Sequence, residues 1–208
     1  MNWYRYFTAL SFALCAISLL YHLIRLIRLG RPQDYASPRG NPQSGIAYSF
    51  LGAMNPAKKE SAYLHLPTYA AGLIYHLGTF MSVFLAFIFF FEAAPAGVLR
   101  ILLLTLISLS CLSGCVMFVK RLLSKNLRFL SVPDDYISNL LVTLFQVFTV
   151  GMLADLPVAP VYFSLTGILF LYIPVGKLKH ALYFFAARYH LGLFYGRRGV
   201  WPVANRDK

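Results

Sequence analysis

Five long apolar runs alternate with short polar stretches along the chain, and this pattern predicts five transmembrane helices. A helix needs about 20 apolar residues to cross the hydrocarbon core of a bilayer. The runs that meet this length, or nearly so, cover residues 7–29, 69–91, 98–119, 136–154 and 158–176. Helix-forming and aromatic residues follow the last run, so we expect a helical extension to about residue 192. The predicted fold class is an all-α membrane protein, a bundle of about five transmembrane helices.

The polar stretches are too short to fold alone, so residues 1–208 are expected to form a single integral membrane domain. Residues 30–62 are predicted to be a cytoplasmic loop, because the segment "SPRGNPQSG" favours turns over helix. This loop is either a docking surface for a cytoplasmic partner or a connection without such a role. Before the fourth run, Asp134 or Asp135 is expected to cap the helix. Residues 193–208 are predicted to be a cytoplasmic tail.

Basic residues are distributed unevenly between the two ends of the predicted helices. Seventeen of the 19 lysines and arginines lie from the end of the first run (Arg25) to the second, between the third and fourth runs, or after the fifth. Only Arg5 and Arg100 lie on the opposite side. Loops rich in Lys and Arg remain cytoplasmic in membrane proteins. The sequence therefore predicts an outside N-terminus, a cytoplasmic C-terminus and a multi-pass location in the inner (cytoplasmic) membrane of the cell.

Composition agrees with a membrane location and argues against nucleic-acid binding. The chain is 59% hydrophobic and 12% charged, with a mean hydropathy of +0.63, whereas soluble domains carry about a quarter charged residues. A net charge of +12 is compatible with binding nucleic acid. However, the basic residues cluster between apolar runs, and no soluble segment interleaves them with aromatic residues. The basic residues are therefore expected to lie beside the lipid bilayer and not to bind nucleic acid.

All five histidines lie in or beside the apolar runs, where ionisable groups are costly and usually mark function. The second and fifth helices are predicted to be antiparallel, so His76 matches the depth of His180, and His65 matches that of His190. Within each helix the two histidines are about 15 Å apart along the axis. A heme iron can take one imidazole on each face, which leaves an electron carrier. The four histidines are therefore candidate axial ligands of two hemes b, or of one.

Three details qualify this heme interpretation. On a straight helix, His180 and His190 are about 80° apart around the axis, so two hemes require a bend or rotation near residues 177–185. His22 stands alone on the first helix, and we interpret it as a hydrogen-bonded core or interface residue. The basic side chains at the cytoplasmic end are candidate partners of heme propionates, although ordinary cytoplasmic flanking gives the same pattern. These side chains are Lys177, Lys179, Arg188 and Arg197.

Three segments carry a resemblance to a known family: "GLIYHLGTF" around His76, "PVGKLKH" ending at His180, and "ARYHLGLFYGRRG" around His190. They resemble the membrane cytochrome b subunit of the respiratory nitrate reductase gamma type and of heterodisulfide reductase. The resemblance implies two b-type hemes ligated from the second and fifth helices, quinol oxidation or quinone reduction, and a cytoplasmic iron–sulfur subunit. The chain departs from the family about three turns beyond His76, where it has no histidine. Either His65 supplies the other ligand or one heme is missing.

The sequence is thus read as a di-heme cytochrome b, the quinone-reactive membrane subunit of an oxidoreductase complex, using menaquinone or ubiquinone. Two alternatives remain: a single-heme or heme-free anchor that recruits soluble subunits, and a small transporter. The chain lacks the internal repeats and the acidic residues at mid-membrane that are typical of transporters. Candidate groups for quinone chemistry are Glu92, Arg100 and Asp155 near the outer side, and Tyr63, Tyr69 and Asp135 near the inner side.

Overall fold

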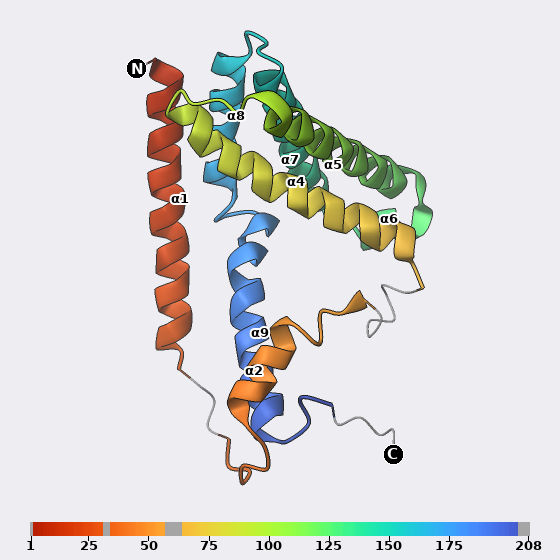
Figure 1. Ribbon diagram of the computed structural model, residues 1–208. Coiled ribbons are helices and arrows are strands. Elements are labelled where there is room, and N and C mark those ends of the chain that lie inside the picture. Colours follow the sequence, from red (N-terminus) through yellow and green to blue (C-terminus); the bar gives the residue numbers. More distant parts are fainter. Residues whose placement is uncertain (1, 31–33, 57–63, 204–208) are drawn as a thin grey trace. The chain divides into compact units, whose positions relative to one another are not determined.

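The computed structural model describes residues 2–30, 34–56 and 64–203, and every regular element in these ranges is a helix (Figure 1). The chain divides into two compact units. Unit 1 comprises Met1–Ser18 and Pro67–Leu178, and unit 2 comprises Leu19–Leu66 and Lys179–Lys208. Six residues that were counted or named from the sequence lie outside the described ranges: Arg31, Lys58, Lys59, Tyr63, Arg206 and Lys208.

The protein is an all-α, multi-pass membrane protein. Within the described residues, four helices are long and apolar enough to cross a bilayer. A broken pair, α8 with the segment Lys177–Arg197, makes five if it counts as one span. The sequence therefore located the first four spans to within a few residues. These helices are α1 (Trp3–Arg28), α4 (Leu66–Phe90), α5 (Gly97–Leu123) and α7 (Pro133–Leu153).

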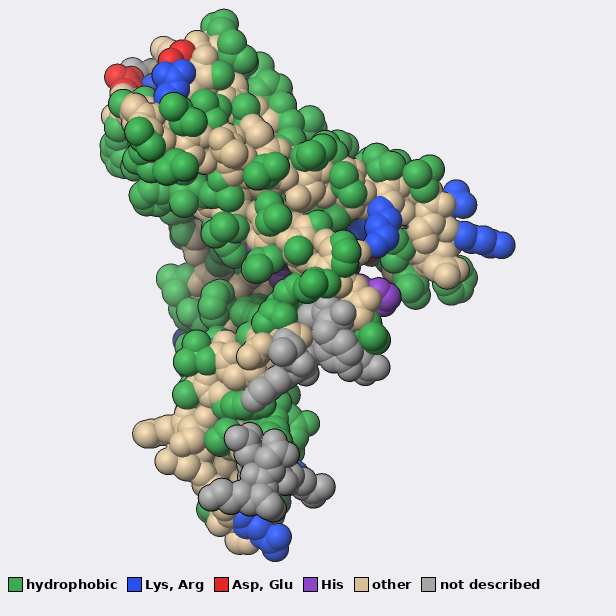
Figure 2. All heavy atoms as spheres, turned by 45° about the vertical axis from the view of Figure 1, so that its right-hand side comes forward, with side chains coloured by type: hydrophobic (Ala, Val, Ile, Leu, Met, Phe, Trp, Pro, Cys, Tyr) green, Lys and Arg blue, Asp and Glu red, His purple; other side chains and the backbone are tan. Residues whose placement is uncertain are grey.

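Unit 1 has an aromatic and aliphatic core among α4, α5, α7 and α8 (Ala159–Tyr172). Phe145 and Tyr162 are fully buried and stack on each other, with ring centroids 5.8 Å apart. Large apolar side chains also cover the outside of the helices, and they dominate the surface in Figure 2. An apolar exterior of this kind is suited to lipid rather than to water.

A buried polar network links α4, α5 and α7 inside unit 1. The Gln146 side chain is fully buried; its amide donates to the Thr79 hydroxyl at 2.8 Å and its oxygen accepts from the Ser110 hydroxyl at 3.1 Å. The Ser110 hydroxyl also lies 3.1 Å from the carbonyl oxygen of Tyr75. Hydrogen bonds of this kind hold transmembrane helices in register, because lipid offers no competing partner. The network fixes the turn of α4 that carries His76.

The fifth apolar run is not one continuous helix, which corrects the span predicted over residues 158–176. Helix α8 ends at Tyr172, a 3₁₀ turn (η2) covers Lys177–Lys179, and α9 runs over His180–Arg197. Pro174 explains the interruption, since it lacks an N–H and its ring cannot follow a helical turn. The helical extension ends at Arg197 rather than near residue 192.

The segment predicted to be a loop of turns contains a helix, α2 (Pro42–Phe50). Asn41 caps this helix: its side-chain oxygen accepts from the Gln43 N–H at 2.8 Å, and Pro42 occupies the first turn. The sequence analysis was wrong here because it took Asn, Pro and Gly as turn residues. The same residue types also mark the start of a helix.

Helix α2 packs on α9 through glycines within unit 2. A Cβ atom at Gly45 would lie 2.3 Å from the Cα of Gly196, and one at Gly192 would lie 2.5 Å from the Cα of Ile46. The two backbones are therefore in direct contact, as at the small-residue interfaces of membrane helices. Gly192 and Gly196 are one helical turn apart and present one face of α9 to α2. This segment is thus part of a helix pair.

Candidate functional site

His76 and His65 lie at α4, but only His76 is inside the helix. His76 is exposed, and its ring stacks on that of Phe80 with centroids 6.5 Å apart. His65 is an exposed residue of the turn that precedes Leu66. Because His65 precedes the helix, the helical geometry that related it to His76 in the sequence analysis does not apply to it. His76 belongs to unit 1 and His180 to unit 2, so their pairing stays a prediction.

His180 and His190 both belong to α9 and point in different directions. His180 is the first residue of the helix and His190 lies ten residues later, so the two side chains are about 80° apart around the axis. The break in the fifth run precedes both histidines and does not separate them. The bend required near residues 177–185 is thus present only as the η2 turn. The two imidazoles serve two different faces of α9.

His190 faces a groove between the second half of α1 and α9, entirely within unit 2. This groove has a volume of about 1130 Å³, and a neighbouring hollow of about 540 Å³ shares His190 and Leu26 with it. Its walls are mainly apolar, and Arg197 lines it as well. Such dimensions and lining are usual for sites that bind organic ligands. His65 is not among the described residues that line the groove, and its pairing with His190 stays a prediction.

Arg197 shares the face of α9 that carries His190, whereas Arg188 does not. Seven residues separate His190 from Arg197, which places their side chains about 20° apart around the helix. Arg188 is about 160° away from His190, and its guanidinium lies over the Phe184 ring, 5.5 Å from the centroid. Among the basic candidates, Arg197 is therefore the one suited to an acidic group bound beside His190. Arg188 suits a group on another face.

His22 has a hydrogen-bonding partner on α9. Its Nδ1 lies 3.3 Å from the Tyr183 hydroxyl, and both residues belong to unit 2. Seven residues, or about 10 Å along the helix, separate Tyr183 from His190. His22 thus has the contact expected for an interface residue. This contact lies at a different position along α9 from His190.

The chain that leads into α2 closes the C-terminal end of α9. The carbonyl oxygen of Arg197 accepts from the N–H groups of Arg39 and Gly40 at 2.9 and 3.1 Å. Its guanidinium donates to the backbone carbonyls of Asp34 and Ala36, both at 3.3 Å. Arg198 pairs with the Asp34 carboxylate at 3.1 Å. These contacts hold Arg197 at the end of the groove.

The Asp34 contacts are expected to weaken in acid. Hydrogen bonding from Arg198, and then from the Ala36 N–H, lowers the pKa of Asp34 below its ordinary value of 3.8. A lowered folded-state pKa adds stability above about pH 4, and this stability is lost as the pH falls through the folded-state value. Hydrogen exchange of the Ala36 amide, corrected for the intrinsic rate, should therefore accelerate below about pH 4 in the wild type. Asp34→Ala, which removes the acceptor of the Ala36 N–H, should exchange quickly at every pH; equal protection in this variant would contradict the assignment.

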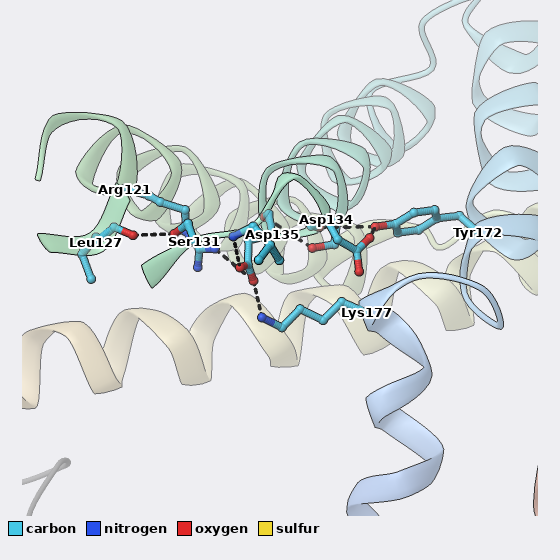
Figure 3. Close-up of polar contacts among 9 residues, drawn as sticks. Arg121, Leu127, Ser131, Asp134, Asp135, Tyr172 and Lys177 are labelled. Carbon is cyan, nitrogen blue, oxygen red and sulfur yellow. Dashed lines mark hydrogen bonds and ion pairs between the residues drawn. The ribbon is translucent and has the colours of Figure 1, made fainter. Parts of the chain in front are cut away.

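Two adjacent carboxylates at the start of α7, those of Asp134 and Asp135, make several polar contacts (Figure 3). Asp135 is only 8% exposed and accepts from Lys177, from Arg121 at 3.1 Å and from the Val132 N–H at 3.1 Å. The bond to Val132 confirms that Asp135 caps this helix. Asp134 accepts from the Tyr172 hydroxyl. Lys177 thus pairs with Asp135, and a heme propionate would have to compete with this carboxylate for Lys177.

Two further acidic residues, both candidates for quinone chemistry, are held in ion pairs in unit 1. Glu92 pairs with Arg5, and Asp155 pairs with Arg100 at 2.6 Å. Both acids follow a helix end and have positive φ values, of 60° and 56°. This conformation is uncommon for residues other than glycine. Both carboxylates remain exposed, so a proton can still reach them.

An aromatic pocket lies between α1, α4 and α8 in unit 1. Its volume is about 190 Å³, and its walls include Phe12, Phe87 and Phe170. The one hydroxyl in its lining, that of Thr8, donates to the carbonyl oxygen of Phe163 at 2.6 Å. The pocket therefore offers stacking surfaces and few hydrogen bonds, and it is suited to a flat apolar ring.

The donor set restricts which metal group the chain can hold. No cluster of three or more His, Cys, Asp or Glu side chains suited to a bare metal ion occurs in the described part of the chain. A heme needs only one or two protein ligands, because the porphyrin supplies the other four. The half-buried imidazole of His190, the apolar groove and the guanidinium of Arg197 fit such a group. No known protein family, curated protein or solved structure matches the chain.

Proposed function

We propose that the protein is a b-type cytochrome that passes electrons between a membrane quinone pool and a redox partner, with two heme sites. The observation that carries this proposal is the His190 groove: an imidazole, mainly apolar walls, and the Arg197 guanidinium beside Asp34 at the end. His190 and Arg197 would hold one heme, by an axial bond and by contact with a propionate. His76 and His180 would ligate the other heme, and His65 remains the candidate second ligand beside His190.

Bound heme would supply one-electron transfer, and the chain's residues would supply its setting. The Gln146 network fixes the turn that bears His76, and the contacts of Arg39 and Gly40 fix the end of the helix that bears His190. The mainly apolar groove walls would provide an apolar setting for a bound heme. Ligation by two imidazoles would favour electron transfer over oxygen chemistry.

The quinone part of the proposal is supported by the aromatic pocket and the two exposed carboxylates. The pocket of Phe12, Phe87 and Phe170 would stack on a quinone ring. Glu92 and Asp155 would take protons released from a quinol, since both are exposed to solvent. Arg5 and Arg100 are the two lysine or arginine residues of the 19 that the sequence places at that end, in keeping with an outside location. The opposite, basic end would then bind an iron–sulfur subunit in the cytoplasm.

Anaerobic quinol titration tests this function. A menaquinol or ubiquinol analogue, added to the purified protein in nanodiscs, should produce the absorbance band of a reduced b-type heme. A heme-free anchor, the main alternative, shows no such band even with dithionite. Hemes that dithionite reduces and neither quinol reduces would contradict the quinone-reactive role. The plasma membrane of a bacterial host is the expected location of the expressed protein.

A further inference from the structure

The short break between α8 and η2 is held at both sides by one turn of α7. On one side, the Tyr172 hydroxyl at the end of α8 donates to Asp134. On the other side, the Lys177 ammonium at the start of η2 pairs with Asp135. Figure 3 shows the Tyr172 and Lys177 side chains directed towards these two neighbouring carboxylates. All four residues belong to unit 1.

The backbone of the break depends on Tyr172. Pro174 has no N–H to donate, and the next two N–H groups, those of Val175 and Gly176, both donate to the Tyr172 carbonyl oxygen, at 3.1 and 2.8 Å. A Cβ atom at Gly176 would lie 2.4 Å from the Tyr172 ring, so a larger residue there would require the ring to move. The phenol is thereby pressed against the break while its hydroxyl is bound to Asp134. The two backbone hydrogen bonds of the turn and the contact with Gly176 therefore all involve Tyr172.

Asp135 is placed to resist any change in this arrangement. It is buried, and it balances two cations, Lys177 and Arg121, which come from the elements η2 and α5. Loss of its charge would leave two partly exposed cations close together without their shared partner. His180, the first residue of α9, follows Lys177 by three residues. The position of Lys177 therefore limits where His180 can lie.

We propose that Asp134 and Asp135 form a two-point clamp that fixes both sides of the break to α7 and thereby positions His180. Asp135 is a positioning residue in this account, because it acts through Lys177. The consequence for His180 rests on the proposed function, whereas the clamp itself does not. Because of the break, α9 begins as a separate helix at His180 rather than as a continuation of α8.

Hydrogen exchange of the full chain in nanodiscs tests the clamp without reference to heme. In Asp135→Asn the amides of Val175 and Gly176 should exchange about tenfold faster, as expected when a partly buried ion pair opens. Lys177→Met, which alters a half-exposed side chain, should give the same local change. Asp155→Asn breaks an ion pair beyond the other end of α7 and should leave these amides unchanged. Unchanged exchange at Val175 and Gly176 in both Asp135→Asn and Lys177→Met would overturn the clamp.

A spectroscopic measurement tests the consequence for His180. The low-spin electron paramagnetic resonance signal of the heme that is lost in His180→Ala should shift or broaden in Asp135→Asn and return in Asp135→Glu. A wild-type signal in Asp135→Asn, with faster exchange at the break, would overturn the positioning of His180. A wild-type chain without heme would contradict the proposed function, and the exchange measurement would then decide the clamp alone.

Discussion

Replacing His180 with alanine is expected to halve the heme content of the purified protein, and His76→Ala is expected to do the same. The physical reason is that a b-type heme is retained by its axial imidazoles, and both residues are proposed to ligate one iron. The helices should remain inserted, because neither histidine belongs to the buried core. The heme-to-protein ratio by pyridine hemochrome assay measures the change.

The double variant and a matched histidine sharpen this prediction. If His76 and His180 share one iron, the double variant should lose no more heme than either single variant. His22→Ala is the control, because His22 bonds to Tyr183 and is not proposed to ligate either iron. Full heme content in both single variants would refute the assignment. Loss of all heme in the double variant alone would show that the two residues bind different irons.

Replacing Gly192 with alanine is expected to separate α2 from α9. The added Cβ would lie 2.5 Å from the Cα of Ile46, where only a backbone shift can make room. Overpacking of this kind costs about 3 kcal/mol at the upper end of its usual range. The amides of α2 should lose their protection in hydrogen exchange, and the unfolding midpoint should fall.

Gly72 provides the matched control for this substitution. It lies in α4, and a Cβ atom there would meet no other heavy atom within 4 Å. Gly72→Ala should therefore be neutral or stabilise the protein by up to about 1 kcal/mol, through helix propensity. Equal unfolding midpoints in Gly192→Ala and Gly72→Ala would show that the helix contact is not tight.

The sequence was sufficient for the helices whose apolar length alone specifies them. α1, α4, α5 and α7 were predicted because about 20 apolar residues have one stable arrangement in lipid. α2 was missed because its nine residues are too few to show a clear period, and its stability comes from contact between Gly45 and α9. The end of α8 was missed although Pro174 marks it, because an apolar run conceals a break when hydropathy alone is considered.

The candidate site was less accessible from sequence than the spans. The five residues were candidate heme ligands because they are histidines. Whether an imidazole faces a groove, however, depends on tertiary packing. The groove at His190 involves α1, which the sequence analysis did not connect with any ligand. Arg197 and Arg188 are indistinguishable as basic residues near a helix end, and only their angular positions on α9 separate them. The clamp of Asp134 and Asp135 joins residues about 40 positions apart.

Heme content of the wild-type chain tests the central claim most directly. The protein should be expressed in a heme-sufficient host, purified in mild detergent, and assayed for pyridine hemochrome against protein concentration. The account predicts two b-type hemes per chain, with a low-spin spectrum typical of two imidazole ligands. A chain that is folded, inserted and free of heme would contradict it.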